Sequence, residues 1–465
     1  MTSVRLASDT IVAIATPLGR SAIGVLRISG PRTRYIADQM FRSLGRPLRP
    51  RRVCLGELID PQRSDRVLDR VVALWFPGPQ SYTGEDLLEL QAHGGPRNLS
   101  QILEQVLGSG DARLAEPGEF TLRAFVNGKL DLTEAEAVAD LIDAQSDAAA
   151  ELARSQLIGG LRQRIVELRE PVVDELVALE AELDFPEEGD LFTERERGAR
   201  QERLEGLSRA CQILAGSADW GERLLAGFRV LLAGPPNAGK SSLFNCLLGE
   251  ERALVHEESG TTRDLIEGRC DLKGLPLVLV DGAGWNESAQ GVERAGVQRM
   301  RQGLLDCQLV LLVLDASQPL SSAHLTPLLR RLERVECLVV ANKLDLGHVL
   351  DPGMIKELTG IDAQRCCAVS ALTGEGLEEL WQRIAERLDR GRVEGPLATR
   401  ARHRQALDSC ASALQRARDW LAAGPAVDRA AEELREAVQW LDRISGLAYD
   451  EELLDRVFSR FCVGK

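Results

Sequence analysis

The residues Gly-Pro-Pro-Asn-Ala-Gly-Lys-Ser at positions 234–241 have the types and spacing of a loop that binds a triphosphate. Gly234 and Gly239 allow the backbone to curl so that its N–H groups face the phosphates. In this pattern the lysine, here Lys240, reaches the β- and γ-phosphates, and the hydroxyl of Ser241 binds Mg²⁺. The loop therefore predicts a nucleoside triphosphate and Mg²⁺ as ligands.

The residues on either side of the loop favour the same interpretation. A strand is expected over the apolar residues 228–233, and a helix is expected over 242–248. The positive end of such a helix faces the bound anion. A glycine-rich turn between strand and helix that binds no ligand is the alternative.

Two downstream segments predict which nucleotide is bound. Residues 281–284 (Asp-Gly-Ala-Gly) follow an expected strand, where the aspartate can order Mg²⁺ through water and the Gly284 N–H can meet the γ-phosphate. Residues 342–345 (Asn-Lys-Leu-Asp) follow another, and the Asp345 carboxylate can accept hydrogen bonds from guanine N1–H and the guanine amino group. Adenine would leave this buried carboxylate unpaired, so the sequence predicts GTP rather than ATP.

Further contacts to the nucleotide are expected from two more segments. Backbone N–H groups of 370–372 can donate to guanine O6, and Thr262 can give Mg²⁺ a second hydroxyl that is released after hydrolysis. Thr261 beside it leaves that assignment open. The expected contacts are Asn237, Ala238, Gly239, Lys240, Ser241, Ser242, Thr261, Thr262, Asp281, Gly282, Ala283, Gly284, Asn342, Lys343, Leu344, Asp345, Ser370, Ala371 and Leu372.

The composition is that of a globular protein with about three domains. The chain has 465 residues, of which 44% are hydrophobic and 28% charged, and its net charge is −14. This charge argues against a surface that coats nucleic acid broadly, but it leaves open a local basic patch at residues 46–52. We interpret this run as a solvated loop, and a basic patch is the alternative. No apolar stretch reaches the roughly 18 residues that span a bilayer. Ten scattered cysteines without a C-x-x-C pair predict a reducing, cytoplasmic location.

Three kinds of sequence pattern along the chain predict a multidomain fold. Residues 1–127 mix short strands with turns and predict an α+β domain. Residues 227–388 alternate strands and helices and predict an α/β P-loop GTPase domain. Residues 128–226 and 389–465 are helical in character, so the GTPase domain is expected to be inserted into an all-α domain.

Individual elements are also expected within these parts. Long helices should run from Leu132 to about Gly221 with a break near 184–189, and Thr133 with Glu136 should form a capping box at the first helix. Strands are expected at 23–28, 71–76, 277–280, 309–314 and 337–340.

Short motifs outside the GTPase part are distributed along the whole chain. They are Asp9-Thr10-Ile11-Val12-Ala13 with Ala15-Thr16-Pro17, Leu26-Arg27-Ile28-Ser29-Gly30, Tyr82-Thr83-Gly84-Glu85-Asp86 with His93-Gly94-Gly95-Pro96, Pro117-Gly118-Glu119-Phe120, Arg123-Ala124-Phe125 with Lys129-Leu130-Asp131-Leu132, and Phe461-Cys462-Val463-Gly464-Lys465. Together with the GTPase motifs, they resemble the MnmE (TrmE) family of tRNA modification GTPases.

The resemblance implies a function and partners. Members of this family form homodimers and act with MnmG (GidA) in a heterotetramer. They add an aminomethyl-type group, such as carboxymethylaminomethyl, to C5 of the wobble uridine of certain tRNAs. The one-carbon unit comes from 5-formyl- or 5,10-methylene-tetrahydrofolate.

The resemblance also implies roles for individual residues. Glu293 would orient or polarise the attacking water, and Cys462 would lie near the folate, which leaves open whether it takes part in the modification. The folate contacts carried over by motif are Arg27, Glu89, Lys129 and Lys465 in the N-terminal and last segments.

The family uses K⁺ in place of an arginine finger, and the same resemblance assigns residues to this ion. Its ligands would be Asn237, His256, Glu258 and Thr261, with Glu257, Ser259 and Gly260 completing the segment beside the nucleotide. His256 stands where the family usually has a small hydroxyl residue, and Gly282 stands where it usually has threonine. If the His256 carbonyl is the ligand, the change has no effect; if a hydroxyl is required, K⁺ affinity falls.

Two other functions stay open at this point. One is a ribosome-assembly GTPase of the Era or Der type, and the other is a GTP-gated scaffold without chemistry of its own. An RNA-binding loop of the K-x-x-G type after the GTPase part would favour the first. The chain instead has glutamate-rich helices and Cys-Val-Gly-Lys at 462–465.

Overall fold

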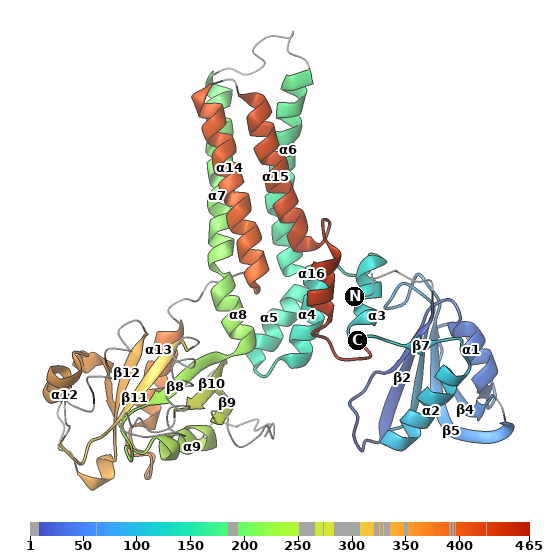
Figure 1. The fold of residues 1–465 in the computed structure, drawn as a ribbon, viewed down its shortest axis with the longest axis horizontal. Helices are drawn as coiled ribbons and strands as arrows, with labels where there is room; N and C mark the ends of the chain where they lie inside the picture. Colours follow the sequence, from blue (N-terminus) through green and yellow to red (C-terminus); the bar gives the residue numbers. More distant parts are fainter. Residues whose placement is uncertain are drawn as a thin grey trace, which may run out of the picture. The chain divides into compact units, whose positions relative to one another are not determined.

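Two compact units make up the chain in the computed structural model (Figure 1). Unit 1 comprises residues 1–142, 155–211 and 406–465, and unit 2 comprises 143–154 and 212–405. The described residues are 9–61, 63–184, 194–250, 266–272, 274–282, 307–319, 325, 329, 335–347, 352–389, 392, 395, 397–424 and 426–465. Among them, no helix combines the length and the apolar character that crossing a membrane requires.

Unit 1 contains a seven-stranded sheet in the order β3-β4-β5-β6-β2-β1-β7. Its strands are β1 (Ile11–Ile14), β2 (Ile23–Ser29), β3 (Phe41–Ser43), β4 (Cys54–Asp60), β5 (Arg63–Phe76), β6 (Leu87–His93) and β7 (Arg113–Leu114). All neighbouring strands are antiparallel except β1 and β7. The strands expected at 23–28 and 71–76 are therefore confirmed.

One face of this sheet is covered by helices α1 (Thr33–Met40) and α2 (Pro96–Gly108). Every second residue of β2 and β6 is buried, because successive side chains of a strand point to opposite faces. Leu26 and Leu90 thus join a core with residues of both helices, such as Leu99 of α2. The intervening residues of the two strands face away from these helices.

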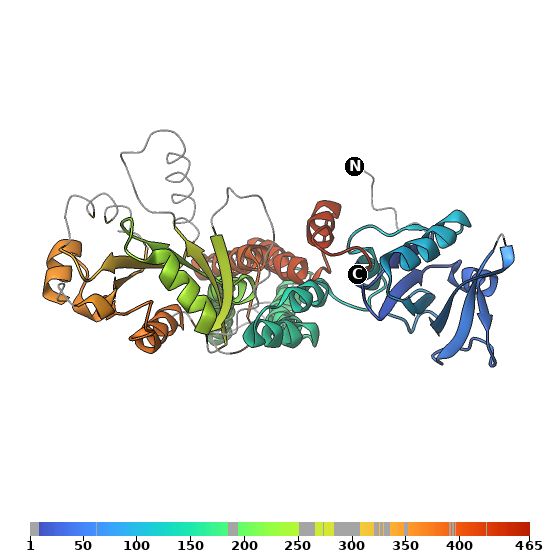
Figure 2. The same cartoon turned by 90° about the horizontal axis from the view of Figure 1, so that it is seen from below.

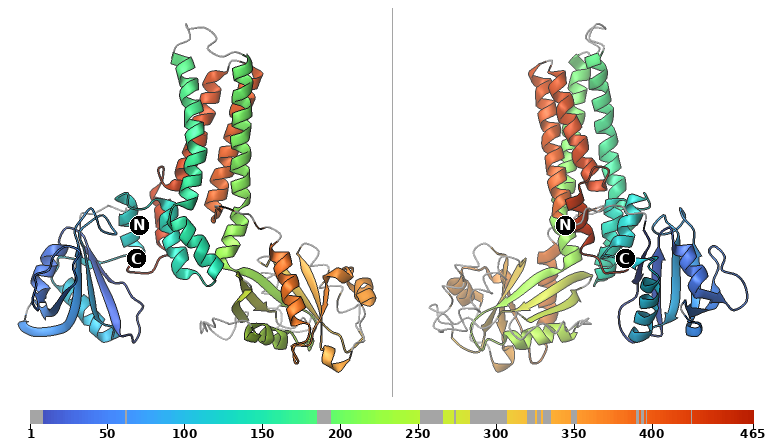
Figure 3. Two further views of the ribbon diagram at one scale, coloured as in Figure 1. Left: turned by 180° about the vertical axis from the view of Figure 1, so that it is seen from behind. Right: turned by 45° about the vertical axis from the view of Figure 1, so that its right-hand side comes forward.

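The helical part of unit 1 pairs elements that are far apart in sequence. Its helices are α3 (Glu119–Val126), α4 (Leu132–Asp143), α6 (Gly160–Asp184), α7 (Glu194–Gly216), α14 (Ala401–Ala423), α15 (Val427–Ser445) and α16 (Glu451–Phe458), of which α7 ends and α14 begins in unit 2. Figures 1 and 3 show α6, α7, α14 and α15 side by side. The Arg169 guanidinium pairs with Asp442 at 2.6 Å, and the Cys211 and Cys410 thiols lie 3.8 Å apart. α6 ends at Asp184, where the expected break near 184–189 begins, and the rest of that segment lies outside the described residues.

The capping box at the start of α4 differs from the expected one. The Asp131 carboxylate accepts hydrogen bonds from the Glu134 N–H and the Thr133 hydroxyl, and the Glu134 carboxylate accepts one from the Asp131 N–H. The box therefore consists of Asp131 and Glu134, and the prediction of Thr133 with Glu136 was wrong. Both pairs have the required spacing, but the helix begins at Leu132, so Asp131 occupies the cap position.

Residues 461–465 extend along the N-terminal part of unit 1. Pro117 and Val463 form an antiparallel bridge, and the Phe120 N–H donates to the Lys465 carbonyl at 3.2 Å. Gly464 has φ +99°, and a Cβ atom there would meet the Ile14 carbonyl, so this close approach requires glycine. The last residues of the sequence therefore form part of the N-terminal layer.

Unit 2 contains a six-stranded sheet in the order β13-β12-β11-β8-β10-β9. Its strands are β8 (Phe228–Ala233), β9 (Ile266–Leu272), β10 (Leu275–Asp281), β11 (Leu309–Asp315), β12 (Cys337–Asn342) and β13 (Cys366–Ala368). Only β9 is antiparallel to its neighbour. The strands expected at 228–233, 277–280, 309–314 and 337–340 are confirmed.

Helices of unit 2 cover both faces of this sheet. They include α8 (Ala218–Ala226), α9 (Lys240–Glu250), α12 (Pro352–Thr359) and α13 (Leu377–Leu388). One core contains residues of α8, α9 and α13, and α9 runs alongside the strands in Figure 2. A second core contains Ile355 of α12. Residues 143–154 also belong to this unit, because Leu152 of α5 (Asp147–Leu157) packs in the first core.

Candidate functional site

The loop between β8 and α9 lies at the carboxyl edge of the sheet in unit 2. β8 lies between β10 and β11, so strands that follow it along the chain lie on both of its sides. Open α/β sheets bind ligands at such a switch point, where the strand order reverses. Lys240 is the first residue of α9 and is 7% exposed. Its ammonium group donates to the carbonyls of Gly234 at 3.2 Å and Pro235 at 2.8 Å. Burial lowers the pKa of Lys240, and the nearby Asp281 charge opposes this shift.

Two glycines of the loop are required by their backbone geometry. Gly239 has φ +88°, and a Cβ atom there would collide with the Asn342 side chain. Gly234 has φ +152°, and a Cβ atom there would collide with the Val313 carbonyl. Asn237 also has a left-handed backbone, with φ 59°, which asparagine tolerates better than most residues. The loop can therefore approach a ligand with its N–H groups.

Ser241 and Asp281 form a pair that fits Mg²⁺ and its bound water. The Ser241 hydroxyl donates to Asp281 Oδ2 at 2.7 Å. Asp281 Oδ1 is buried and has no hydrogen-bond partner within the described part of the chain. Pairing of Asp281 with Leu232 on β8, and the hydrogen bond from the Gly282 N–H to the Leu232 carbonyl at 3.0 Å, fix this carboxylate beside the loop. A hydroxyl and a carboxylate oxygen are hard donors of the kind that Mg²⁺ prefers.

The side-chain amide of Asn342 joins three segments of the site. Its nitrogen donates to the Ala238 carbonyl at 3.0 Å, and its oxygen accepts from the Ala371 N–H at 3.0 Å. Asn342 is 1% exposed. Beside it, the Ser370 hydroxyl donates to the Asp345 carboxylate. The structure thus brings the loop, the 342–345 segment and the 370–372 segment together.

Lys343 has a partner that sequence reasoning missed. Its ammonium group lies 2.7 Å from the Asp315 carboxylate, and its φ is 68°. Burial opposes ionisation of Asp315, but hydrogen bonds from Lys343 and Ser317 outweigh it and lower the pKa of this carboxyl. Asp315 ends β11 opposite Asn342 on β12. The signal in the sequence was an aspartate at the end of an apolar strand parallel to the one that carries Asn342.

Of the other predicted nucleotide contacts, some are described by the structure and the rest lie outside its described residues. Ser242 lies in the first turn of α9, Leu344 begins a short 3-10 helix, and Leu372 is 84% exposed. The predicted residues outside the described part of the chain are His256, Glu257, Glu258, Ser259, Gly260, Thr261, Thr262, Ala283, Gly284 and Glu293. Of the expected K⁺ ligands, the structure therefore describes Asn237.

In unit 1, three of the four expected folate contacts lie together. Arg27 on β2 is opposite Glu89 on β6 and donates to its carboxylate at 3.1 and 2.8 Å. Arg27 also donates to the Gly464 carbonyl at 3.5 Å. Burial and the positive charge of Arg27 lower the pKa of Lys465, while Glu89 opposes this shift. Lys129 has an exposed side chain, and its N–H donates to the Ala124 carbonyl at the end of α3.

Two aromatic rings complete this group of residues and were missed by sequence reasoning. The Arg27 guanidinium lies over the rings of Tyr82, 5.4 Å from its centroid, and Phe120, 5.7 Å from its centroid. The Tyr82 hydroxyl bonds to the Thr121 hydroxyl at 2.9 Å, and burial raises the pKa of Tyr82. Both rings stand in motifs that carried the resemblance. Cys462 has an exposed side chain, and its carbonyl accepts from the Gly118 N–H.

A buried ion cluster holds α3 against the sheet. Arg123 is 5% exposed and donates to Asp9, Glu85 and Glu119. Arg113 pairs with Asp9 at 2.7 Å and with Glu119 at 2.6 Å. Burial would raise the pKa of Glu119, but its bonds to Arg113 and Arg123 outweigh this and lower it. The cluster fixes α3, which places Phe120 beneath Arg27.

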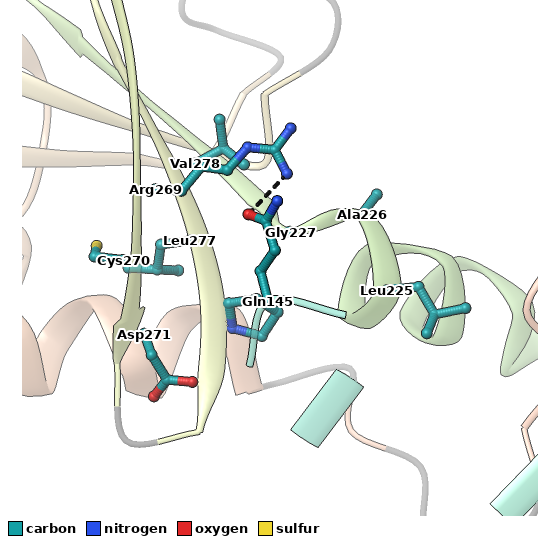
Figure 4. A pocket seen from close by; sticks show the side chains of 10 residues that line it. Gln145, Leu225, Ala226, Gly227, Arg269, Cys270, Asp271, Leu277 and Val278 are labelled. Carbon is teal, nitrogen blue, oxygen red and sulfur yellow. Dashed lines mark hydrogen bonds between the residues drawn. The ribbon is translucent and has the colours of Figure 1, made fainter. Parts of the chain in front are cut away.

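A small hollow lies at the other end of β10 from Asp281, within unit 2 (Figure 4). The Arg269 guanidinium of β9 donates to the Gln145 side chain across it at 3.1 Å. The volume of the hollow is about 50 Å³. Pockets for small ligands are usually on the order of 300–1,000 Å³, so this hollow does not hold a nucleotide.

Comparison with known proteins adds independent evidence about the family. A model described as "GTP-binding protein TrmE N-terminus" matches residues 10–129, and one described as "MnmE helical domain" matches residues 132–462. A relative from Thermotoga petrophila, called tRNA modification GTPase MnmE, is 40% identical over 462 residues, covering 98% of this chain and 100% of the relative. The relative of the same name from Nitrosococcus oceani is 42% identical over 462 residues, covering 99% and 98%.

A solved structure resembles a smaller part of the chain. The G domain of the T. maritima FeoB iron transporter is 32% identical, with a TM-score of 0.29, and covers 34% of this chain and 98% of that chain. The family assignment therefore depends on the two family models and the full-length relatives.

Replacing Asn342 by alanine should lower GDP affinity about tenfold, because two hydrogen bonds that join the 234–241 loop to the 370–372 segment are lost. Titration with a fluorescent GDP analogue measures this effect. Asn245→Ala, which changes an exposed asparagine of α9, is the matched control and should leave affinity unchanged. Equal affinities of Asn342→Ala and the unmodified protein would contradict the role of this amide.

Proposed function

Because the chain belongs to the MnmE family of tRNA modification GTPases, we propose that it drives wobble-uridine modification by K⁺-dependent GTP hydrolysis. It is a GTP-hydrolysing enzyme of tRNA modification. The proposed reaction, carried out with MnmG, adds a (carboxymethyl)aminomethyl group to C5 of the uridine and uses a one-carbon unit from tetrahydrofolate. The observation that carries the proposal is the match to both family models and to full-length relatives, and the Lys240–Ser241–Asp281 geometry supports it.

The proposed domain organisation follows the sequence boundaries. Residues 1–127 would bind tetrahydrofolate and form the homodimer, and 227–388 would be the GTPase domain. Residues 128–226 and 389–465 would form the helical domain in two parts. A homodimer bound to MnmG in a heterotetramer, in the cytoplasm and with tRNA as substrate, completes the proposal.

The main residues of the proposed nucleotide site each have a proposed role. Lys240 holds the β- and γ-phosphates, and Asp345 distinguishes guanine from adenine. Ser241 and Thr262 would hold Mg²⁺ directly, with Asp281 acting through water; the bound ion neutralises charge on the β- and γ-oxygens. Glu293 would orient the attacking water.

The proposed K⁺ ligands are Asn237, His256, Glu258 and Thr261. Asn237 is the member of this set whose geometry supports the proposal, because its left-handed backbone belongs to the curl of the phosphate loop. Cationic charge held there would offset charge that develops on the transferred phosphoryl group.

Replacing Na⁺ in the buffer by K⁺ should raise the GTP hydrolysis rate on the order of tenfold or more. The reason is that bound K⁺ would stabilise the transition state as an arginine finger does. Asn237→Gly should abolish this response without backbone strain, because glycine adopts φ 59° freely while lacking the amide. Phosphate release assays in the two salts measure the effect, and GDP affinity of the variant serves as the control. Equal rates in Na⁺ and K⁺ would refute the K⁺ mechanism.

The proposed folate site is that of Arg27, Glu89, Lys129 and Lys465. Arg27 and Lys465 are like charges held close together in a half-buried position, which favours an anionic ligand such as the glutamate tail of folate. The Glu89 carboxylate can accept hydrogen bonds from the N–H groups of a pterin edge. Cys462 is proposed to take part in the modification from its place near this group.

Calorimetric titration with 5-formyl-tetrahydrofolate should show saturable binding to the whole protein. Arg27→Ala should weaken it about tenfold or more, because a charge-assisted hydrogen bond to the ligand is lost. Arg97→Ala removes an exposed arginine of the same unit, with 77% of its side chain exposed, and should bind as the unmodified protein does. Absence of heat with the unmodified protein would rule out this site.

The whole function can be tested by analysing tRNA nucleosides in cells that lack this protein. The C5-modified wobble uridine should disappear and should return when the unmodified gene is restored. Glu293→Ala should bind GTP normally but fail to restore the modified nucleoside. Unchanged wobble uridine together with immature ribosomal subunits would favour the Era- or Der-type alternative instead.

A further inference from the structure

The loop between β3 and β4 carries an unusual density of arginine. Residues 46–52, here called the arginine loop, read Arg-Pro-Leu-Arg-Pro-Arg-Arg. All four of its arginines are exposed, which confirms that this run is a surface loop. Residues 31–76 together contain ten arginines, no lysine and five acidic residues, although the chain as a whole has a net charge of −14. The loop is therefore the centre of a basic region in an acidic protein.

The backbone of the arginine loop is held at several points. The Arg51 N–H donates to the Trp75 carbonyl at 2.8 Å, and Pro50 bridges the same residue of β5. The Cys54 thiol donates to the Arg46 carbonyl at 3.1 Å. Leu48, between the arginines, packs against the core of the N-terminal sheet. These contacts hold the backbone of the loop, so its arginines project from anchored positions.

The arginines of the loop differ from their neighbours in charge pairing. Around the loop, five arginines each lie within 4 Å of a carboxylate: Arg32, Arg34, Arg42, Arg66 and Arg70. Within the described residues, no carboxylate pairs with the four of the loop, and only Arg51 has a side-chain hydrogen bond, to the Gln80 carbonyl at 3.0 Å. Arg63, the tenth arginine, also has no carboxylate partner among the described residues, so four of the five unpaired arginines of this region lie in the arginine loop.

We propose that the arginine loop contacts the phosphate backbone of the tRNA substrate, an inference that rests on the proposed function. Guanidinium groups bind phosphate oxygens through paired hydrogen bonds, and all the cations here are arginines. Because the rest of the chain is acidic, its field repels RNA elsewhere and turns RNA towards this loop.

Phosphate contacts of this kind fix position and carry no sequence information. The arginine loop would therefore strengthen binding of different tRNAs to a similar extent. It would also make that binding sensitive to salt, because each neutralised phosphate releases counterions.

The test uses the full chain with Arg46→Gln, Arg49→Gln and Arg52→Gln combined. Arg51 is left in place because its side-chain bond to the Gln80 carbonyl supports the loop. Fluorescence anisotropy with labelled tRNA transcripts, in a series of salt concentrations, should show a loss of affinity of about tenfold or more. Log affinity declines with log salt concentration, and this decline should become less steep by about 2 to 3, at roughly 0.7–0.9 for each lost phosphate contact.

A matched control changes the net charge equally at other exposed arginines of unit 1. Arg97→Gln, Arg164→Gln and Arg209→Gln remove three that are each paired with a glutamate, and tRNA affinity should stay within about twofold. Circular dichroism and the GTP hydrolysis rate should be unchanged in both triple variants, because neither set touches the nucleotide site.

Three outcomes would overturn the inference. They are equal affinity and salt slope for the arginine-loop variant and the unmodified protein, an equal loss in the control, and a loss of binding to anionic phospholipid vesicles with tRNA binding retained. Failure of the proposed function is separate, because the wobble nucleoside in cells is measured independently of binding by the purified protein.

Discussion

The amide side chain of Asn342 is the contact on which the nucleotide site of unit 2 depends. One buried group bonds to the 234–241 loop at Ala238 and to the 370–372 segment at Ala371, so the two segments proposed to hold phosphate and base are kept at a fixed separation. A buried amide left half-satisfied costs free energy, which favours the arrangement in which both segments are in place. The collision that a side chain at Gly239 would make with the same amide explains why the loop needs glycine there.

The arrangement of the proposed nucleotide site was predictable from sequence where it follows from a local run of residues. Lys240, Ser241 and Asp345 stand in short motifs whose backbone shape is set by nearby residues, and the structure places them at the carboxyl edge of the sheet. Asp315 was not predictable in this way, because its pairing with Lys343 depends on the register of β11 against β12. The same reason applies to Tyr82 and Phe120, whose rings meet Arg27 only after three segments have packed.

Some features of the fold were likewise predictable from the sequence, and others required the structure. Strands β8, β11 and β12 of unit 2 are apolar runs buried on both faces, and such runs are distinctive in a sequence. The capping box of α4 was placed two residues too late, because Asp131 and Thr133 both have a glutamate three positions on. In the arginine loop, composition predicted exposure, but the anchoring of its backbone to Trp75 required the structure.

The bond between Arg27 and Gly464 joins residues 437 positions apart. At about 5–20 residues per second, a ribosome needs roughly 20 to 90 seconds to make the chain between them. The N-terminal sheet can pair its strands during this time, but the group around Arg27 and Glu89 lacks its last partners until residues 462–465 have emerged. A chain released early would keep its GTPase strands while lacking this group. The group around Arg27 can therefore form only after residues 462–465 have been made, whereas the strands of unit 2 can pair before then.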